Sequence, residues 1–207
     1  VSDYIFNLSK KYFSANKKKS FVSPIGYNPK YFFKNPKCNT NKTILFVGRI
    51  DPKKGIYKYF SVLSTISNYL NENNYTAKII GRIDDPLFFD TLNKYKVKYN
   101  VEYLGEKNRT ELGDYFNSAI LTIVPSFYEA FGLVAVESLA CGTPVACFPV
   151  GGFSDYMEDN YNGIFLNQSD DVKSGEKILN YLQNEELMKE CSQNSPASVE
   201  KYNIIYI

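Results

Sequence analysis

The sequence contains no histidine and only four cysteines, Cys38, Cys141, Cys147 and Cys191. Without histidine, a Ser-His-Asp triad is excluded. The cysteines show no C-x-x-C spacing, so a zinc site is not expected either. Cys141 and Cys147 lie in apolar segments, which predicts buried thiols that stay reduced.

An excess of charge of one sign is also missing. The 24 lysines and arginines are almost balanced by 22 acidic residues, which leaves a net charge of +2. We therefore expect no nucleic-acid partner. No apolar run approaches the ~20 residues of a membrane span, and no secretory signal is visible, so the expected location is the cytoplasm. Apolar residues make up 44% of the chain and include 18 tyrosines and 15 phenylalanines, enough for a substantial core.

From residue 43 onward, apolar runs alternate with segments of helical spacing. The expected strands are 43–50, 76–81, 101–105, 119–126, 144–150 and 163–166. The expected helices are 56–70, one from about 86, 108–119 with an Asn108–Glu111 start, 132–142 with Gly142 at its end, and two between 170 and 202. Uniformly apolar strands alternating with helices predict an α/β fold, a doubly wound parallel sheet of Rossmann-like type.

Residues 1–42 do not share this alternation. They are polar and aromatic, and Pro24, Gly26, Pro29 and Pro36 interrupt them. We therefore predict two parts: residues 1–42 as the remnant of a preceding domain plus a linker, and residues 43–207 as the α/β domain.

A first candidate site is the stretch "GRIDPKKG" (48–55), directly after the first strand. Ligands of open parallel sheets bind at the carboxyl ends of the strands. Arg49 and Lys54 would lie there and suit a phosphate group, the first as a fork and the second as a point charge. A solvated turn explains the same residues equally well, and the stretch is no Walker A loop.

A second candidate site is "PSFYEAFGLVAVESLACGTPV" (125–145). The backbone amides near the expected helix start form a potential anion site; they belong to Ala130, Phe131, Gly132 and Leu133. Gly132 would also let a ligand approach the backbone closely.

This stretch carries two glutamates, Glu129 and Glu137, eight positions apart (137 minus 129). Glu137 lies about five residues, or ~7.5 Å, along the helix from its start. The two carboxylates could contact both ends of an elongated ligand with an anionic middle, such as a nucleotide-diphosphate sugar, because each can accept hydrogen bonds from a vicinal diol. The alternatives are a first-turn residue favoured by the helix dipole for Glu129 and an exposed helix residue for Glu137.

The stretches "GRIDPKKG", "YLGEKNRTELGDYFNSA" and "PSFYEAFGLVAVESLACGTPVACFPVGG" together resemble a known family. They are similar to the donor-binding half of retaining glycosyltransferases of the GT-B fold, family 4, also called glycosyl transferases group 1, whose E-x7-E signature is present as Glu129 and Glu137. The resemblance extends from about residue 20 to 190. "PIGYNPKYF" (24–32) resembles the interdomain linker of the family, with Asn28 where an Asp is usual. By this resemblance residues 1–42 end the acceptor domain, and 43–207 form the C-terminal donor-binding domain.

The resemblance also implies roles for individual residues. Arg49 and Lys54 would hold the diphosphate and, with Glu129, form the catalytic group; Glu129 would contact the sugar and Glu137 the ribose. The implied donor-binding residues are Gly48, Gly81, Leu104, Ala130, Phe131, Gly132, Leu133 and Glu137. The base would lie near Gly81 and Leu104. Here the chain departs from the family, because Arg82 stands where a second glycine is frequent.

The function implied is that of a hexosyltransferase. It would use a UDP- or GDP-sugar to build a polysaccharide, glycolipid or glycoprotein glycan, on a glycan, lipid-linked or protein acceptor. No D-x-D motif is present, so we expect no metal and no other cofactor, with Arg49 and Lys54 supplying the positive charge. The alternatives are a sugar-nucleotide epimerase or a phosphorylase of the same fold, or a non-catalytic nucleotide-sugar-binding module. Without its acceptor domain, the chain alone should bind donor but not transfer sugar. That missing domain could also hold the protein peripherally at the inner membrane.

Overall fold

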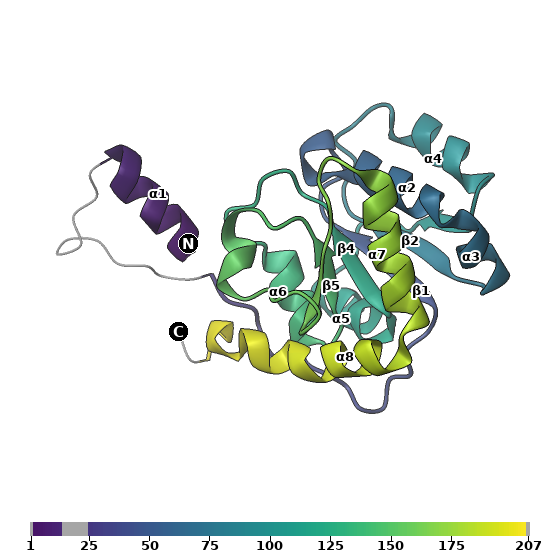
Figure 1. Cartoon of the computed structure of the whole chain (residues 1–207). Helices are drawn as coiled ribbons and strands as arrows, with labels where there is room; N and C mark the ends of the chain where they lie inside the picture. Colours follow the sequence, from purple (N-terminus) through teal and green to yellow (C-terminus); the bar gives the residue numbers. More distant parts are fainter. Residues whose placement is uncertain (1, 14–24, 206–207) are drawn as a thin grey trace.

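The computed structural model describes residues 2–13 and 25–205, and its centre is one parallel sheet (Figure 1). Six strands are hydrogen-bonded in the order β3-β2-β1-β4-β5-β6, and every pairing is parallel. They are β1 (Thr43–Val47), β2 (Thr76–Ile80), β3 (Val101–Tyr103), β4 (Leu121–Val124), β5 (Val145–Cys147) and β6 (Gly163–Phe165). All six predicted strands and the doubly wound fold are confirmed. The order reverses between β1 and β4, and such a reversal opens a crevice at the carboxyl ends of the two strands.

Helices cover both faces of the sheet. One face is covered by α2 (Ile56–Thr65), α3 (Ser67–Glu72), α4 (Phe88–Lys96) and α7 (Asp171–Gln183), and the other by α5 (Arg109–Ser118) and α6 (Leu133–Ala140). Helix α8 (Glu185–Val199) packs against the first core cluster near its start and against the second at its end. Strand β1 shows why its whole sequence is apolar. Ile44 and Phe46 are buried in the first core cluster, while Leu45 is buried in the second. Alternate side chains of a strand point to opposite faces, so a sheet covered on both faces needs apolar residues throughout.

Two helix predictions were wrong in their boundaries. The helix expected over 56–70 is interrupted at Ile66, whose φ of −116° and ψ of 19° are not helical. The apolar spacing runs through the break because Ile66 is buried there as well. The next helix begins at Phe88 rather than near 86, because Asp85 forms a turn first: its carboxylate accepts the Leu87 N–H at 3.0 Å, and its carbonyl accepts the Phe88 N–H at 3.2 Å.

Other helix ends agree with the sequence. Asn108 and Glu111 form the expected capping box of α5, with two N–H to side-chain hydrogen bonds of 3.0 Å. Beyond α6, Gly142 has a φ of 80° and donates its N–H to the Leu139 carbonyl at 2.9 Å. The two helices expected after residue 170 are α7 and α8. The predicted burial of Cys141 and Cys147 is confirmed.

The N-terminal part packs against the α/β domain at two places. Helix α1 (Asp3–Phe13) lies beside the 3₁₀ turn η2 (Gly151–Asp155): Asp3 donates its N–H to the Asp155 carboxylate at 2.9 Å. Tyr27 donates its N–H to the Tyr202 carbonyl at 2.9 Å, after the end of α8. Residues 14–24, within the predicted segment 1–42, lie outside the described part, and the boundary at residue 42 stays a prediction. No helix in the described ranges is long and apolar enough to cross a membrane.

Candidate functional site

A cavity of about 160 Å³ lies in the crevice where the strand order reverses. Its walls come from the carboxyl ends of β1 and β4, from the segments that follow these two strands, and from the start of α6. Its lining residues are Phe46, Val47, Gly48, Lys54, Val124, Ser126, Glu129, Leu133 and Val134. Four predicted site residues therefore meet in one cavity: Gly48, Lys54, Glu129 and Leu133.

The turn after β1 sets the position of Lys54. The Asp51 carboxylate accepts the Lys54 N–H at 3.0 Å and so caps the short 3₁₀ turn η1 (Pro52–Lys54). Gly55 follows with a φ of 78°, and a Cβ on it would lie 1.9 Å from the Pro125 carbonyl oxygen. The turn is thus pressed against the chain leaving β4, and only glycine fits there. This contact brings Lys54 next to the loop that carries Glu129.

Lys54 and Glu129 form an ion pair with 2.7 Å between Nζ and Oε2, across 75 positions of sequence. Their side chains are only 29% and 16% exposed. A pair that is partly withdrawn from water is screened less by salt than a surface pair. The predicted phosphate-binding cation and the predicted sugar-binding carboxylate are therefore in direct contact.

Arg49 lies outside the cavity. Its guanidinium is 3.6 Å from the Asp51 carboxylate and 3.6 Å from that of Asp84, and its side chain is 56% exposed. Arg82, where the family frequently has glycine, also pairs with Asp84 through two hydrogen bonds of 2.8 and 3.1 Å. These hydrogen bonds lower the pKa of Asp84. Both arginines thus pair with acidic residues just beyond the carboxyl ends of β1 and β2, beside the cavity.

The first turn of α6 presents unused amides. Among the described residues, the N–H groups of Phe131, Gly132, Leu133 and Val134 donate no hydrogen bond. The carbonyls of Phe131 and Gly132, in contrast, accept the hydroxyl of buried Tyr156 at 2.7 and 3.0 Å. Tyr156 therefore fixes the peptide groups of this turn, and the free amides give the helix start the positive character that suits an anion.

Gly132 was predicted to be glycine so that a ligand can approach, but the packing of the chain itself already requires glycine there. Its φ is 86°, and a Cβ would come within 2.4 Å of the Phe153 ring and 2.6 Å of the Tyr156 hydroxyl. Close packing against these aromatic residues excludes any side chain, whether or not a ligand approaches. The Phe131 side chain is likewise buried in the core, where the centroids of its ring and the Tyr202 ring are 5.0 Å apart. Only the backbone of Phe131 is therefore available to a ligand.

The loop carrying Glu129 and Ala130 is held through its backbone. Gly152 donates its N–H to the Glu129 carbonyl at 3.0 Å, and the hydroxyl of Ser2 donates to the Ala130 carbonyl. A Cβ on Gly151 would lie 1.8 Å from the Glu129 carbonyl oxygen. Neither Tyr156 nor this anchoring was predicted. The only sequence signal is the glycine pair before Phe153, which marks a close backbone approach without saying to what.

Glu137 shares a helix face with Leu133 and Val134, which precede it by four and three positions. Within the described part of the chain, its carboxylate has no hydrogen bond or ion pair. Burial raises its pKa to about 7, and the charge of Arg109 on α5 acts in the opposite direction. A half-buried carboxylate without a partner is costly. Its position therefore argues against the alternative of an ordinary exposed helix residue. Arg109 was not predicted.

Gly81 and Leu104 lie at the neighbouring strand ends, outside the cavity. Gly81 has a φ of 145°, and a Cβ there would come within 1.8 Å of the Gly48 carbonyl oxygen. Its own carbonyl accepts the Tyr103 hydroxyl at 2.9 Å. Leu104 is partly buried against the core. The predicted base-binding residues therefore line the carboxyl edge of β2 and β3, next to Arg82.

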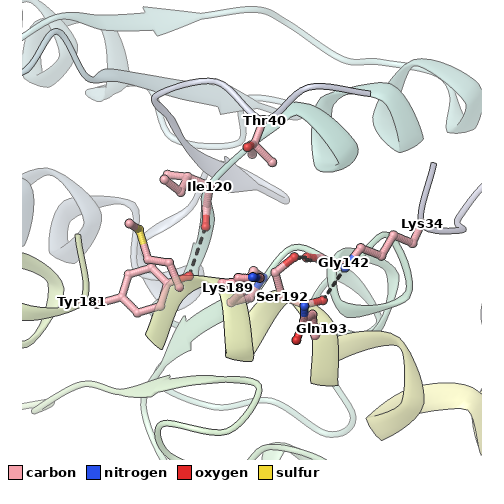
Figure 2. Close-up of a pocket in the computed structure, with 11 residues that line it drawn as sticks. Lys34, Thr40, Ile120, Gly142, Tyr181, Lys189, Ser192 and Gln193 are labelled. Carbon is pink, nitrogen blue, oxygen red and sulfur yellow. Dashed lines mark hydrogen bonds between the residues drawn. The ribbon is translucent and has the colours of Figure 1, made fainter. Parts of the chain in front are cut away.

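A larger cavity, of about 360 Å³, opens at the opposite, amino ends of the strands (Figure 2). Ile120 and Pro144 in its wall directly precede β4 and β5. Figure 2 shows the Lys34 side chain pointing toward Ser192; Nζ donates to the Ser192 carbonyl at 2.9 Å. Ligands of such sheets bind at the carboxyl ends, so size alone does not make this cavity the candidate site.

Comparisons with known proteins identify the family and the fold. Residues 28–198 match the family model for glycosyl transferases group 1. The chain is 32% identical over 162 residues to an uncharacterised glycosyltransferase of Methanocaldococcus jannaschii, covering 77% of this chain and 43% of the relative. It is similar to the solved sucrose-phosphate synthase of Thermosynechococcus elongatus, with a TM-score of 0.83 and 24% identity, covering 98% of this chain and 53% of the other. It is also similar to Anabaena HepE, solved in complex with UDP and glucose, with a TM-score of 0.74 and 17% identity, covering 87% and 52%.

The two solved structures support the fold, a Rossmann-like half of a GT-B glycosyltransferase. The chain spans less than half the length of the relative from Methanocaldococcus jannaschii. The family model, in contrast, covers most of the chain, including both candidate stretches around Lys54 and Glu129. The chain therefore belongs to the family of glycosyl transferases group 1.

Proposed function

We propose that this chain is the donor-binding part of a hexosyltransferase that uses a nucleotide-diphosphate sugar. The observation that carries the proposal is the meeting of Lys54 and Glu129 in one cavity beside the free amides of α6. A cation and amides suit a diphosphate, while a carboxylate suits the hydroxyls of a sugar. Glu137, one turn further along the same helix face, would contact the ribose hydroxyls.

The mechanism follows from where charge develops. Breaking the bond between the sugar and the diphosphate leaves negative charge on the leaving phosphate and positive charge on the sugar ring. Lys54 and the amides of Leu133 and Val134 would stabilise the former, and Arg49 would add a second cation from the rim. The Glu129 carboxylate would hold the sugar. We propose that the configuration at the anomeric carbon is retained and that no metal takes part.

A UDP-sugar is the first donor to test, because the similar Anabaena protein was solved with UDP and glucose; a GDP-sugar is the second. We propose an N-terminal acceptor domain, with residues 1–42 as its end and the linker; the length of the relative that this chain does not cover leaves room for such a domain. The acceptor would be a glycan, a lipid-linked molecule or a protein. We place the enzyme in the cytoplasm, or at the inner membrane through that domain.

A thermal-shift panel of UDP-, GDP- and ADP-sugars tests donor binding by the chain itself. A ligand at ~100 times its dissociation constant should add ~2.7 kcal/mol of stability. One nucleotide should stand out, and its diphosphate alone should stabilise the chain as well. If none of the sugar nucleotides shifts the transition, the proposal is wrong.

Product analysis of the complete protein with the selected donor separates the remaining alternatives. Transfer to an acceptor supports the proposal, whereas isomerisation indicates an epimerase, phosphorolysis a phosphorylase, and no turnover a binding module. The chain alone should bind donor without transferring sugar, because no second domain positions an acceptor or excludes water. Transfer by the chain at the rate of the complete protein would contradict the proposed division.

A further inference from the structure

Ser126 differs from the other buried serines of the chain. It follows β4 by two positions and is 1% exposed, yet its hydroxyl has no hydrogen-bond partner within the described residues. Other buried serine hydroxyls are bonded: Ser138 donates to the Thr143 carbonyl at 2.9 Å and is hydrogen-bonded to the Thr122 hydroxyl at 2.8 Å, and Ser195 donates to the Cys191 carbonyl at 2.7 Å. Buried polar groups are nearly always satisfied, so the exception needs a reason.

Ser126 shares a largely apolar cavity with several hydrogen-bond donors. It lines the 160 Å³ cavity together with Lys54, Glu129, Leu133 and Val134. The Lys54 ammonium and the free amides of Leu133 and Val134 are all hydrogen-bond donors. The charged acceptor that shares the cavity, the Glu129 carboxylate, is taken by Lys54 at 2.7 Å. A site of several donors around one hydroxyl suits an oxygen atom that carries negative charge.

We propose that Ser126 is a further donor-binding residue, whose hydroxyl donates a hydrogen bond to a phosphate oxygen of the sugar nucleotide. The proposal rests on the function proposed above. The diphosphate enters the cavity, replaces Glu129 as the ion-pair partner of Lys54, and supplies the hydrogen-bond acceptor that Ser126 lacks. The unmet hydrogen bond is thus a cost of the ligand-free protein, and it disappears when the donor binds.

This role has a consequence that a structural serine would not show. Ser126→Ala removes a buried hydroxyl that makes no hydrogen bond, so the melting temperature should stay the same or rise. The binding of UDP, GDP or ADP, whichever the chain selects, should weaken about tenfold, the lower range for a hydrogen bond to a charged group. The matched control is Ser138→Ala, which removes two buried hydrogen bonds: it should lower the melting temperature and leave the affinity unchanged.

Calorimetric titration of both variants with the nucleoside diphosphate and with its glucose conjugate tests the assignment. Equal weakening for both ligands in Ser126→Ala supports a phosphate contact. Weakening for the glucose conjugate alone would move the contact to the sugar and overturn the proposal, as would unchanged affinities. If the unaltered chain binds the ligands but Ser126→Ala has no effect, only the role of Ser126 fails. If the unaltered chain binds neither, the proposed function fails as well.

Discussion

The two ends of the sheet carry cavities of opposite character. At the amino ends, in the cavity of about 360 Å³, the hydroxyls of Tyr181 and Ser192 are hydrogen-bonded: Tyr181 donates to the Ile120 carbonyl at 3.4 Å, and Ser192 donates to the Gly142 carbonyl at 2.8 Å. Thr40, the third hydroxyl residue in this lining, is exposed and can bond to water. At the carboxyl ends, the cavity of about 160 Å³ holds the Ser126 hydroxyl, which has no partner among residues 2–13 and 25–205; the Glu137 carboxylate nearby has none in these ranges either. Unmet hydrogen-bonding capacity, rather than volume, distinguishes the end at which we propose that the ligand binds.

The largest expected effect comes from exchanging one lysine at each end. Lys54→Ala should weaken binding of the selected nucleoside diphosphate by about 10- to 100-fold, because a charge-assisted hydrogen bond to phosphate is lost. Lys34→Ala, in the larger cavity, should leave the affinity unchanged. Calorimetric titration of both variants measures the difference. Similar losses in the two would show that the ends do not differ in function.

The pH dependence of binding sharpens the comparison. The pKa of Glu137 is raised to about 7, so its carboxylate ionises between pH 6 and 8. If ribose hydroxyls donate to the ionised form, the affinity for the nucleoside diphosphate should rise by up to about tenfold over this range. Glu137→Gln should weaken binding at pH 8 and remove this part of the rise; what remains in the variant belongs to the ligand's own phosphate. Parallel pH profiles of the two proteins would contradict a ribose contact.

Stability should change in the opposite direction from binding. The folded-state pKa of Glu137, about 7, lies above the ordinary value of 4.5, so folding favours the protonated form. Its contribution to stability is fully present below pH 4.5 and is lost as the pH rises through 7. Glu137→Gln should therefore raise the melting temperature at pH 8 by about 4 °C, which corresponds to ~1–2 kcal/mol, and change it little at pH 5. Thermal unfolding at the two pH values provides the measurement, and a gain that is larger at pH 5 would refute the prediction.

The smallest expected effect comes from Glu129→Gln. The variant releases Lys54 from its ion pair of 2.7 Å. The nucleoside diphosphate should therefore bind about two- to threefold more tightly, which corresponds to the free energy of a partly exposed ion pair. The intact sugar nucleotide should lose its advantage over the diphosphate, because the sugar contact is gone. Competition titrations compare the two ligands. Weaker binding of the diphosphate alone would show that Glu129 assists Lys54 rather than competing with it.

The sequence predicted the strands well because each one is a local signal. In β1, all five consecutive positions are buried, and a strand at the centre of a sheet covered on both faces provides this burial. The order of the strands and the break at Ile66 were not predictable in the same way. Ile66, the residue at the break, is itself buried, so the apolar spacing continues through it and carries no trace of the break.

The site was predicted in its parts but not in its contacts. Lys54 and Glu129 could be named from their motifs, yet their ion pair joins loops 75 positions apart. Ser126 was missed because a serine after a strand is ordinary; only the folded chain shows that its hydroxyl is buried and unpaired. Arg49 was grouped with Lys54 by sequence proximity, whereas the fold directs it to Asp51 and Asp84 at the rim.

The ion pair of Lys54 and Glu129 has a consequence for selectivity. A carboxylate tethered to the same fold competes for the lysine as if it were present at a high and constant local concentration. A free inorganic anion that contacts Lys54 alone must overcome this competitor at every encounter. A larger molecule that also contacts Ser126, the α6 amides and Glu137 displaces it with the sum of its contacts. We therefore expect the pair to act as an affinity threshold, which disfavours abundant small anions and admits a ligand long enough to reach the whole proposed site.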